Sequence, residues 1–176
     1  MTVPETTELV LAICPFSRGL AYVLFEGPLS LIDWAVKDLR ADGRTTLSLQ
    51  VTKSLIERYQ PDVIILHARR AKTARRAATA RRIEQMIAAY ASGQALDCHR
   101  YSREQIRRCF QASGARTRFE IAQVIAAHIP ALSHRLPPKK KLWQSEDRRM
   151  GLFDAASLVM TYYCNREPLA ERVARD

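Results

Sequence analysis

The sequence has few aromatic residues and no long apolar segment. Aromatics make up 7% of the 176 residues, and no apolar run approaches the roughly 20 residues that span a bilayer as a helix. The first residues include Glu5 and Glu8 where a secretory signal would have a basic segment followed by an apolar one. We therefore expect neither a membrane span nor a secretory signal.

Cysteine is scarce and widely spaced. Cys14, Cys98, Cys109 and Cys164 contain no C-x-x-C pair, which argues against a zinc ribbon and against a disulfide-dense scaffold. We expect reduced thiols and a cytoplasmic location.

Acidic residues are also in deficit. The chain has 18 Asp and Glu against 28 Lys and Arg, a formal charge of +10, while 47% of its residues are apolar. Its length and composition suit one globular domain with a sizeable core. The positive charge predicts a polyanionic partner, with nucleic acid ahead of an acidic protein.

Hydrophobic patterning predicts alternating strands and helices. Apolar or alternating runs predict strands over 8–14, 20–25, 29–36, 62–67 and 95–101. Helical periodicity, caps and stop signals predict helices over 45–59, 71–92, 102–110, 118–129 and 147–163. A strand, helix, strand order favours a parallel pair. The predicted fold class is therefore α/β, a mixed five-stranded sheet with helices on both faces, over residues 1–164 with a polar tail at 165–176.

Four stretches in collinear order carry a resemblance to a known family. They are ICPFSRGLAY at 13–22, QPD at 60–62 with Ala71-Lys72 after the strand, YSREQIRR at 101–108 with GARTR at 114–118, and FDAASL at 153–158. Together they resemble the RuvC-type Holliday junction resolvases of the RNase H-like superfamily. The resemblance implies an RNase H-like fold, a homodimer, binding to branched or double-stranded DNA, and a role in DNA recombination and repair.

The resemblance also implies four acidic ligands for two magnesium ions, of which this chain keeps one. Cys14 stands at the acidic position on the first strand, and His67 at that on the fourth. On the last helix Asp154 remains, while the second acidic position falls on Gly151 or Ser157. A thiol and an imidazole are poor magnesium ligands. The resemblance therefore predicts a DNA-binding homologue with degenerate catalysis.

Other site chemistries remain open on the sequence. Glu146 and Asp147 begin the predicted last helix, Asp147 two turns before Asp154. They would serve a rearranged, magnesium- or manganese-dependent endonuclease, or act only as helix caps. Cys14, His67 and Asp154 would together suit zinc or another transition metal. A Cys14–His67 thiolate pair is a further option that no oxyanion motif supports.

Basic residues gather where acids are missing, between Asp62 and Glu84. From this cluster and the family's basic positions we predict nucleic-acid contacts by Arg69, Arg70, Lys72, Arg75, Arg76, Arg82, Arg107 and Arg118. Lys139–Lys141 add a basic run before the last helix. Such cations bind phosphates with a salt-dependent affinity. A solvated helix face is the alternative interpretation, and an acidic protein is the alternative partner.

Overall fold

The computed structural model of the chain describes residues 7–70 and 75–166, without the side chains of Arg75 and Arg76. Its five strands are β1 (Leu9–Phe16), β2 (Gly19–Glu26), β3 (Leu31–Asp38), β4 (Val63–His67) and β5 (Asp97–Tyr101). They lie in the order β3-β2-β1-β4-β5. The β1–β2 and β2–β3 pairs are antiparallel, and the β1–β4 and β4–β5 pairs are parallel. The predicted mixed five-stranded sheet is confirmed.

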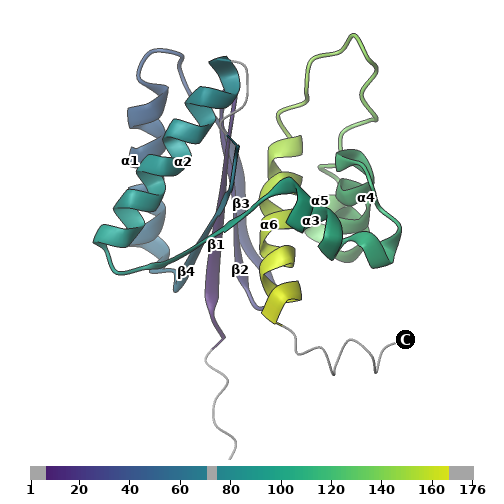
Figure 1. Cartoon of the computed structure of the whole chain (residues 1–176), viewed down its shortest axis with the longest axis horizontal. Coiled ribbons are helices and arrows are strands. Elements are labelled where there is room, and N and C mark those ends of the chain that lie inside the picture. The colour runs from purple at the N-terminus through teal and green to yellow at the C-terminus, as the bar shows by residue number, and fades with distance from the viewer. Residues whose placement is uncertain (1–6, 71–74, 167–176) are drawn as a thin grey trace, which may run out of the picture.

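Helices cover both faces of the sheet (Figure 1). On one face lie α1 (Arg44–Tyr59) and α2 (Arg75–Gly93). On the other lies α6 (Met150–Arg166), with α3 (Arg103–Cys109), α4 (Arg118–His128) and α5 (Pro130–Ser133) beyond it. A 3₁₀ turn spans Gln111–Ser113. Within the described ranges, no helix combines the length and apolarity needed to cross a membrane.

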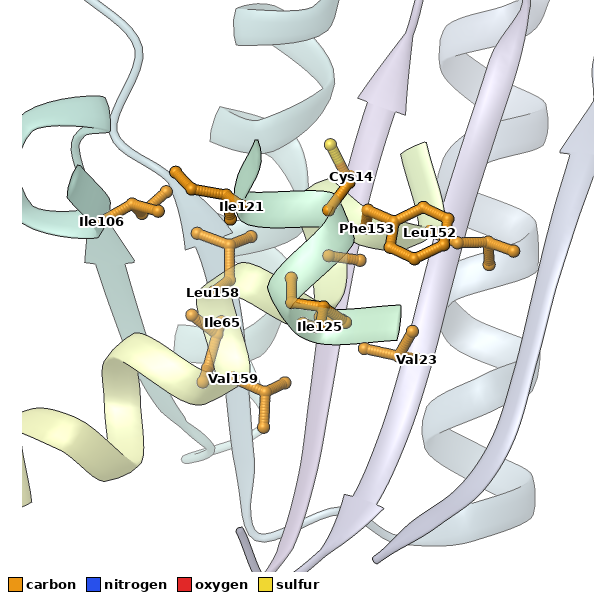
Figure 2. Close-up of a cluster of buried hydrophobic side chains, with 14 of the residues drawn as sticks. Cys14, Val23, Ile65, Ile106, Ile121, Ile125, Leu152, Phe153, Leu158 and Val159 are labelled. Atoms are coloured by element: carbon orange, nitrogen blue, oxygen red, sulfur yellow. The ribbon is translucent and has the colours of Figure 1, made fainter. Parts of the chain in front are cut away.

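The strands bury apolar side chains on both faces because both are covered by helices. On β1, Leu11 and Ile13 pack towards α1 and α2, whereas Ala12 and Cys14 join the core beneath α6. Figure 2 shows part of that second core, with Phe153 of α6 beside the strands. Cys14 lies at its margin, with its sulfur directed away from the other labelled side chains.

Local sequence signals explain where several helices begin and end. Helix α1 ends at the Gln60-Pro61 step, as predicted, and Gln60 there adopts a left-handed conformation (φ 48°). Gly93 is the last residue of α2. Ser102 and Thr117 each cap the following helix through a capping box, which satisfies amides at its first turn.

The predicted starts that are wrong include those of α6 and β3. Helix α6 begins at Met150, three residues later than expected, because the Asp147 carboxylate accepts the N–H of Arg149 (2.9 Å) in a turn that precedes the helix. Pro130 closes α4 as predicted, and it also opens α5, where its missing N–H costs no hydrogen bond. Strand β3 starts two residues late, because a turn with a Glu26 N–H bond to the Ser30 carbonyl (2.9 Å) precedes it.

Strand β2 begins at a glycine that has no room for a side chain. A Cβ on Gly19 would lie 1.8 Å from the carbonyl oxygen of Lys37 in β3, whereas a Cβ on Gly93 would meet nothing within 4 Å. We predict that Gly19→Ala lowers the free energy of unfolding by about 3 kcal/mol, because the two strands must move apart. The matched Gly93→Ala should change it by less than about 1 kcal/mol. Urea denaturation measures both, and equal stabilities would contradict the packing described.

Candidate functional site

The candidate site lies where β1, β4 and α6 meet. Strands β1 and β4 are parallel neighbours, so their carboxyl ends share one edge of the sheet. Cys14 lies near the end of β1 and His67 ends β4. Asp154, in the second turn of α6, places Oδ2 4.0 Å from the Cys14 sulfur. Of the three residues expected to suit a transition metal, Cys14 and Asp154 approach each other, but Cys14, His67 and Asp154 do not form a metal-holding group among the described residues.

Arg118, the first residue of α4, holds Asp154 in a two-pronged ion pair. Its Nε donates to Asp154 Oδ1 at 2.7 Å, and its Nη2 donates to Oδ2. Its Nη1 lies 3.0 Å from Glu146 Oε1, and Lys140 lies 3.6 Å from the other oxygen of Glu146. Burial alone would lower the pKa of Arg118, but the bonds to Asp154 outweigh burial and raise it. One guanidinium thus joins two carboxylates.

Arg69 pairs with a second carboxylate, that of Glu84, at the same end of the sheet. Its Nη2 donates to the Pro15 carbonyl oxygen (3.0 Å) and lies 4.0 Å from the Cys14 sulfur. Its Nε donates to Glu84 Oε1 at 2.7 Å. The Glu84 side chain, on α2, is 0% exposed, and its Oε2 accepts no hydrogen bond from the described residues. Burial raises the pKa of Glu84, although Arg69 opposes that rise.

Cys14 and His67 are both uncharged at neutral pH. Burial, reinforced by Asp154, raises the pKa of Cys14 to about 12, so the thiol keeps its proton. Burial lowers the pKa of His67 to about 4, although Asp154 acts in the opposite direction. A thiolate–imidazolium pair needs the reverse protonation of both groups. The arrangement therefore argues against nucleophilic catalysis by Cys14.

The donor set does not fit the magnesium ions that the family resemblance implies. Hard divalent cations need several convergent oxygen ligands, but both oxygens of Asp154 are bonded to Arg118. The formal charges of the site cancel, because three carboxylates are paired with three cations. The carboxylates are Asp154, Glu84 and Glu146, and the cations are Arg69, Arg118 and Lys140. Over residues 7–70 and 75–166, no group of three or more His, Cys, Asp or Glu is arranged to hold a metal.

Gly151 and Ser157 are the two candidates for the second acidic position on α6. Packing constrains the first, and a hydrogen bond engages the second. A Cβ on Gly151 would lie 3.0 Å from the Cβ of Ala21 and 3.3 Å from Phe16, which leaves no space for a carboxylate. Ser157 is buried and donates its hydroxyl to the backbone carbonyl of Asp154 at 2.7 Å. Neither position supplies a further ligand.

The two acids predicted to begin the last helix differ in their surroundings. Asp147 precedes α6 and bonds to both the N–H and the guanidinium of Arg149. The expectation that Asp147 shares a helix face with Asp154 is therefore wrong, since the helix starts after it. Glu146 does reach the site, through its ion pair with Arg118.

Glu84 is the site residue that sequence reasoning missed. It interrupts an inward-facing stripe of α2 formed by Ala80, Ile83, Ile87 and Ala91. An acid within such a stripe is a usable signal, because buried carboxylates need a cation. The necessary partner, Arg69, was expected on a nucleic-acid surface, but it turns inward with 26% of its side chain exposed.

The other predicted nucleic-acid contacts are placed as follows. Arg70, Arg82 and Arg107 are exposed. Lys72 and the side chains of Arg75 and Arg76 lie outside the described residues. Binding by these residues stays a prediction.

A cleft lined by many basic residues adjoins the site. A cleft of about 1630 Å³ lies between β3, the starts of α1 and α4, and the loop between α5 and α6. Its basic lining residues are Arg18, Arg44, Arg118, Arg135, Lys139, Lys140, Arg148 and Arg149. Its three acids are already in ion pairs, namely Asp38–Arg148, Glu146–Arg118 and Asp147–Arg149. The cleft exceeds the roughly 300–1,000 Å³ of small-molecule pockets and suits a segment of an anionic polymer.

Comparison with solved structures decides the fold. The RuvC protein of Thermus thermophilus in complex with a Holliday junction substrate matches with a TM-score of 0.61 and 12% identity, over 89% of this chain and 93% of that one. The chain has the RuvC-like fold. A second Thermus thermophilus RuvC structure matches with a TM-score of 0.59 and 15% identity, over 94% of this chain and 96% of that one.

A eukaryotic protein shares the RuvC-like fold with this chain. The yeast mitochondrial Holliday junction resolvase Ydc2 matches with a TM-score of 0.61 and 16% identity, over 93% of this chain and 80% of that one. No protein-family model and no curated protein matches the sequence. The RuvC-like fold is therefore supported by structural likeness at low sequence identity.

His67 should make the stability of the protein depend on pH. Its pKa falls from 6.5 to about 4 on folding, so the folded state excludes a proton that the unfolded state accepts below pH 6.5. Stability is then complete above pH 6.5 and is lost as the pH falls towards 4, by roughly 3 kcal/mol in total. We expect the difference in unfolding free energy between wild type and His67→Gln to change by roughly that amount over this window. A constant difference would contradict the buried, neutral imidazole.

Proposed function

We propose that this chain is a RuvC-like protein that binds branched or double-stranded DNA and does not cleave it by two-metal chemistry. The observation that carries the proposal is the pair of guanidinium groups at the sheet end. Arg118 and Arg69 neutralise Asp154 and Glu84 from within the chain. Carboxylates engaged in this way are poorly available to magnesium or manganese.

DNA binding is supported by the cleft beside this centre. Cations from separate elements line one continuous hollow, and its acids are already paired. Lys and Arg side chains arranged along a groove can follow a phosphate backbone. A solved structure of similar fold was obtained with a Holliday junction substrate, which supports branched DNA as the first ligand to test.

Binding and cleavage of a synthetic four-way junction test the proposal directly. We expect the protein to bind the junction in EDTA, with no requirement for magnesium, and to leave it uncut with magnesium, manganese or zinc. Affinity should fall steeply with salt as counterions are released on binding. Failure to bind either the junction or a matched duplex at low salt would overturn the proposal.

Substitution of Arg118 should allow a divalent metal ion to bind to the carboxylates that Arg118 now neutralises. In Arg118→Gln, Asp154 and Glu146 lose the guanidinium that joins them. We expect 10 mM magnesium to raise the melting temperature of this variant by about 2–4 °C, as for a ligand bound with about 1 kcal/mol of linkage. Wild type and the exposed control Arg107→Gln should not respond. An equal magnesium response in all three proteins would contradict the role given to Arg118.

The alternatives give different outcomes in the same assays. Metal-dependent cleavage that Asp154→Asn abolishes would establish a rearranged endonuclease and overturn the loss of chemistry. Tight binding to an acidic protein, without affinity for DNA, would establish the second alternative. The homodimer and the cytoplasmic location are parts of the proposal that rest on the family resemblance and on cysteine usage. Light scattering of the purified protein tests the dimer.

A further inference from the structure

The loop between α5 and α6 ends in a closed turn with an apolar tip. The N–H of Gln144 donates to the Lys141 carbonyl oxygen at 3.1 Å, and the N–H of Lys141 donates to the Gln144 side chain at 3.0 Å. Leu142 and Trp143 are the two residues between these bonds. Figure 1 shows the loop projecting beyond the N-terminal end of α6. The turn therefore holds two large apolar side chains at a protruding corner.

These side chains are exposed although neither is polar. Leu142 is 100% exposed and Trp143 79% exposed. Exposure of a tryptophan forgoes the favourable burial of its large apolar surface. The two hydrogen bonds that close the turn constrain the backbone, so the ring is presented without the entropy cost of ordering a flexible loop on binding. A preformed, exposed ring suits a stacking ligand.

The charge around the ring selects the kind of ligand. Lys141 lies over the ring, its Nζ 5.5 Å from the ring centroid. Residues 135–149 carry six Lys or Arg against two Asp or Glu, and both acids are paired with arginines. The base of the same loop lines the basic cleft through Lys139 and Lys140. An aromatic ring beside one cation, in a loop rich in basic residues, suits a flat, apolar group attached to phosphates, which is a nucleotide base.

We propose that Trp143 stacks on an unpaired or unstacked base of a DNA branch point while the cleft beneath it holds the adjoining phosphate backbone. This inference rests on the proposed DNA binding and adds a residue that recognises DNA structure. Bases within an intact duplex are already stacked on their neighbours, so opening a step costs a few kcal/mol. A branch point exposes base faces without that cost. Trp143 therefore favours branched over fully paired DNA.

Substitution of Trp143 tests this preference. Stacking on one base is worth about 1–3 kcal/mol, so Trp143→Ala should bind a four-way junction with exposed bases roughly 5- to 150-fold more weakly. Binding to a fully paired duplex of the same length should change less than twofold. Trp143→Phe, which keeps an aromatic ring, should retain most of the junction preference. Fluorescence anisotropy of labelled DNA measures all of these affinities, and an unchanged melting temperature shows that the variants are folded.

A spectroscopic measurement separates stacking from other contacts. The chain has two tryptophans, so Trp34→Phe leaves Trp143 as the single reporter. Its emission should be quenched by the junction and not by the duplex at equal occupancy. Lys141→Gln is the charge control, which should weaken binding to both DNAs and lower the salt slope by about one unit.

The outcomes distinguish this inference from the proposed function. Wild type that binds neither DNA overturns the proposed function. Wild type that binds DNA, with Trp143→Ala losing equal affinity for junction and duplex or losing none, overturns only the stacking role. A change in oligomeric mass in Trp143→Ala with unchanged DNA affinity would show instead that the turn contacts a second protein copy.

Discussion

The bidentate pair between Arg118 and Asp154 is the interaction on which the end of the sheet depends. Asp154 faces the buried thiol of Cys14, and a carboxylate withdrawn from water in this way needs a cation close by. Arg118 supplies it from α4 and also reaches Glu146. A single side chain thus ties the starts of α4 and α6 and the loop before α6. Arg69 repeats the solution for the fully buried Glu84.

A guanidinium and a divalent metal satisfy the same carboxylates but differ in chemistry. The guanidinium is tethered to the chain and donates directional hydrogen bonds with a single charge. A metal ion has open coordination positions and lowers the pKa of a bound water, which creates a nucleophile. Arginine can therefore stabilise the fold at this edge without supplying the nucleophile. An arginine at this edge is therefore compatible with the proposed loss of cleavage chemistry in a RuvC-like fold.

The sequence was informative wherever the signal was local. Alternating and continuous apolar runs placed the buried strands, and Gln60-Pro61, Gly93 and Ser102 marked helix ends through backbone and capping effects that neighbouring residues determine. The late start of α6 was not predicted, because Asp147 was expected in the helix but instead forms a turn with Arg149. Nothing in a periodic pattern distinguishes those two uses of an aspartate.

The site was less predictable because its contacts join distant residues. Cys14 and Asp154 are 140 positions apart, and their meeting was expected only through a family resemblance. Arg69 was interpreted as part of a basic surface because it lies in a stretch of sequence without acidic residues. Its partner, Glu84, is the first acidic residue after that stretch and lies on α2. The lining of the cleft includes Arg18, Arg44 and Arg148, which come from separate parts of the chain. Residues that are isolated in sequence become a charged surface only once the strands have paired.

The loop before α6 links the Arg118–Asp154 centre to the exposed surface. Glu146 anchors its end to Arg118, while Lys140 both contacts Glu146 and lines the cleft. An arginine in the centre therefore also fixes the position of the cations, and of the turn that follows them, through a short span of chain. The ion pair between Glu146 and Arg118 holds the loop without a metal ion, as the proposed metal-independent binding of DNA requires.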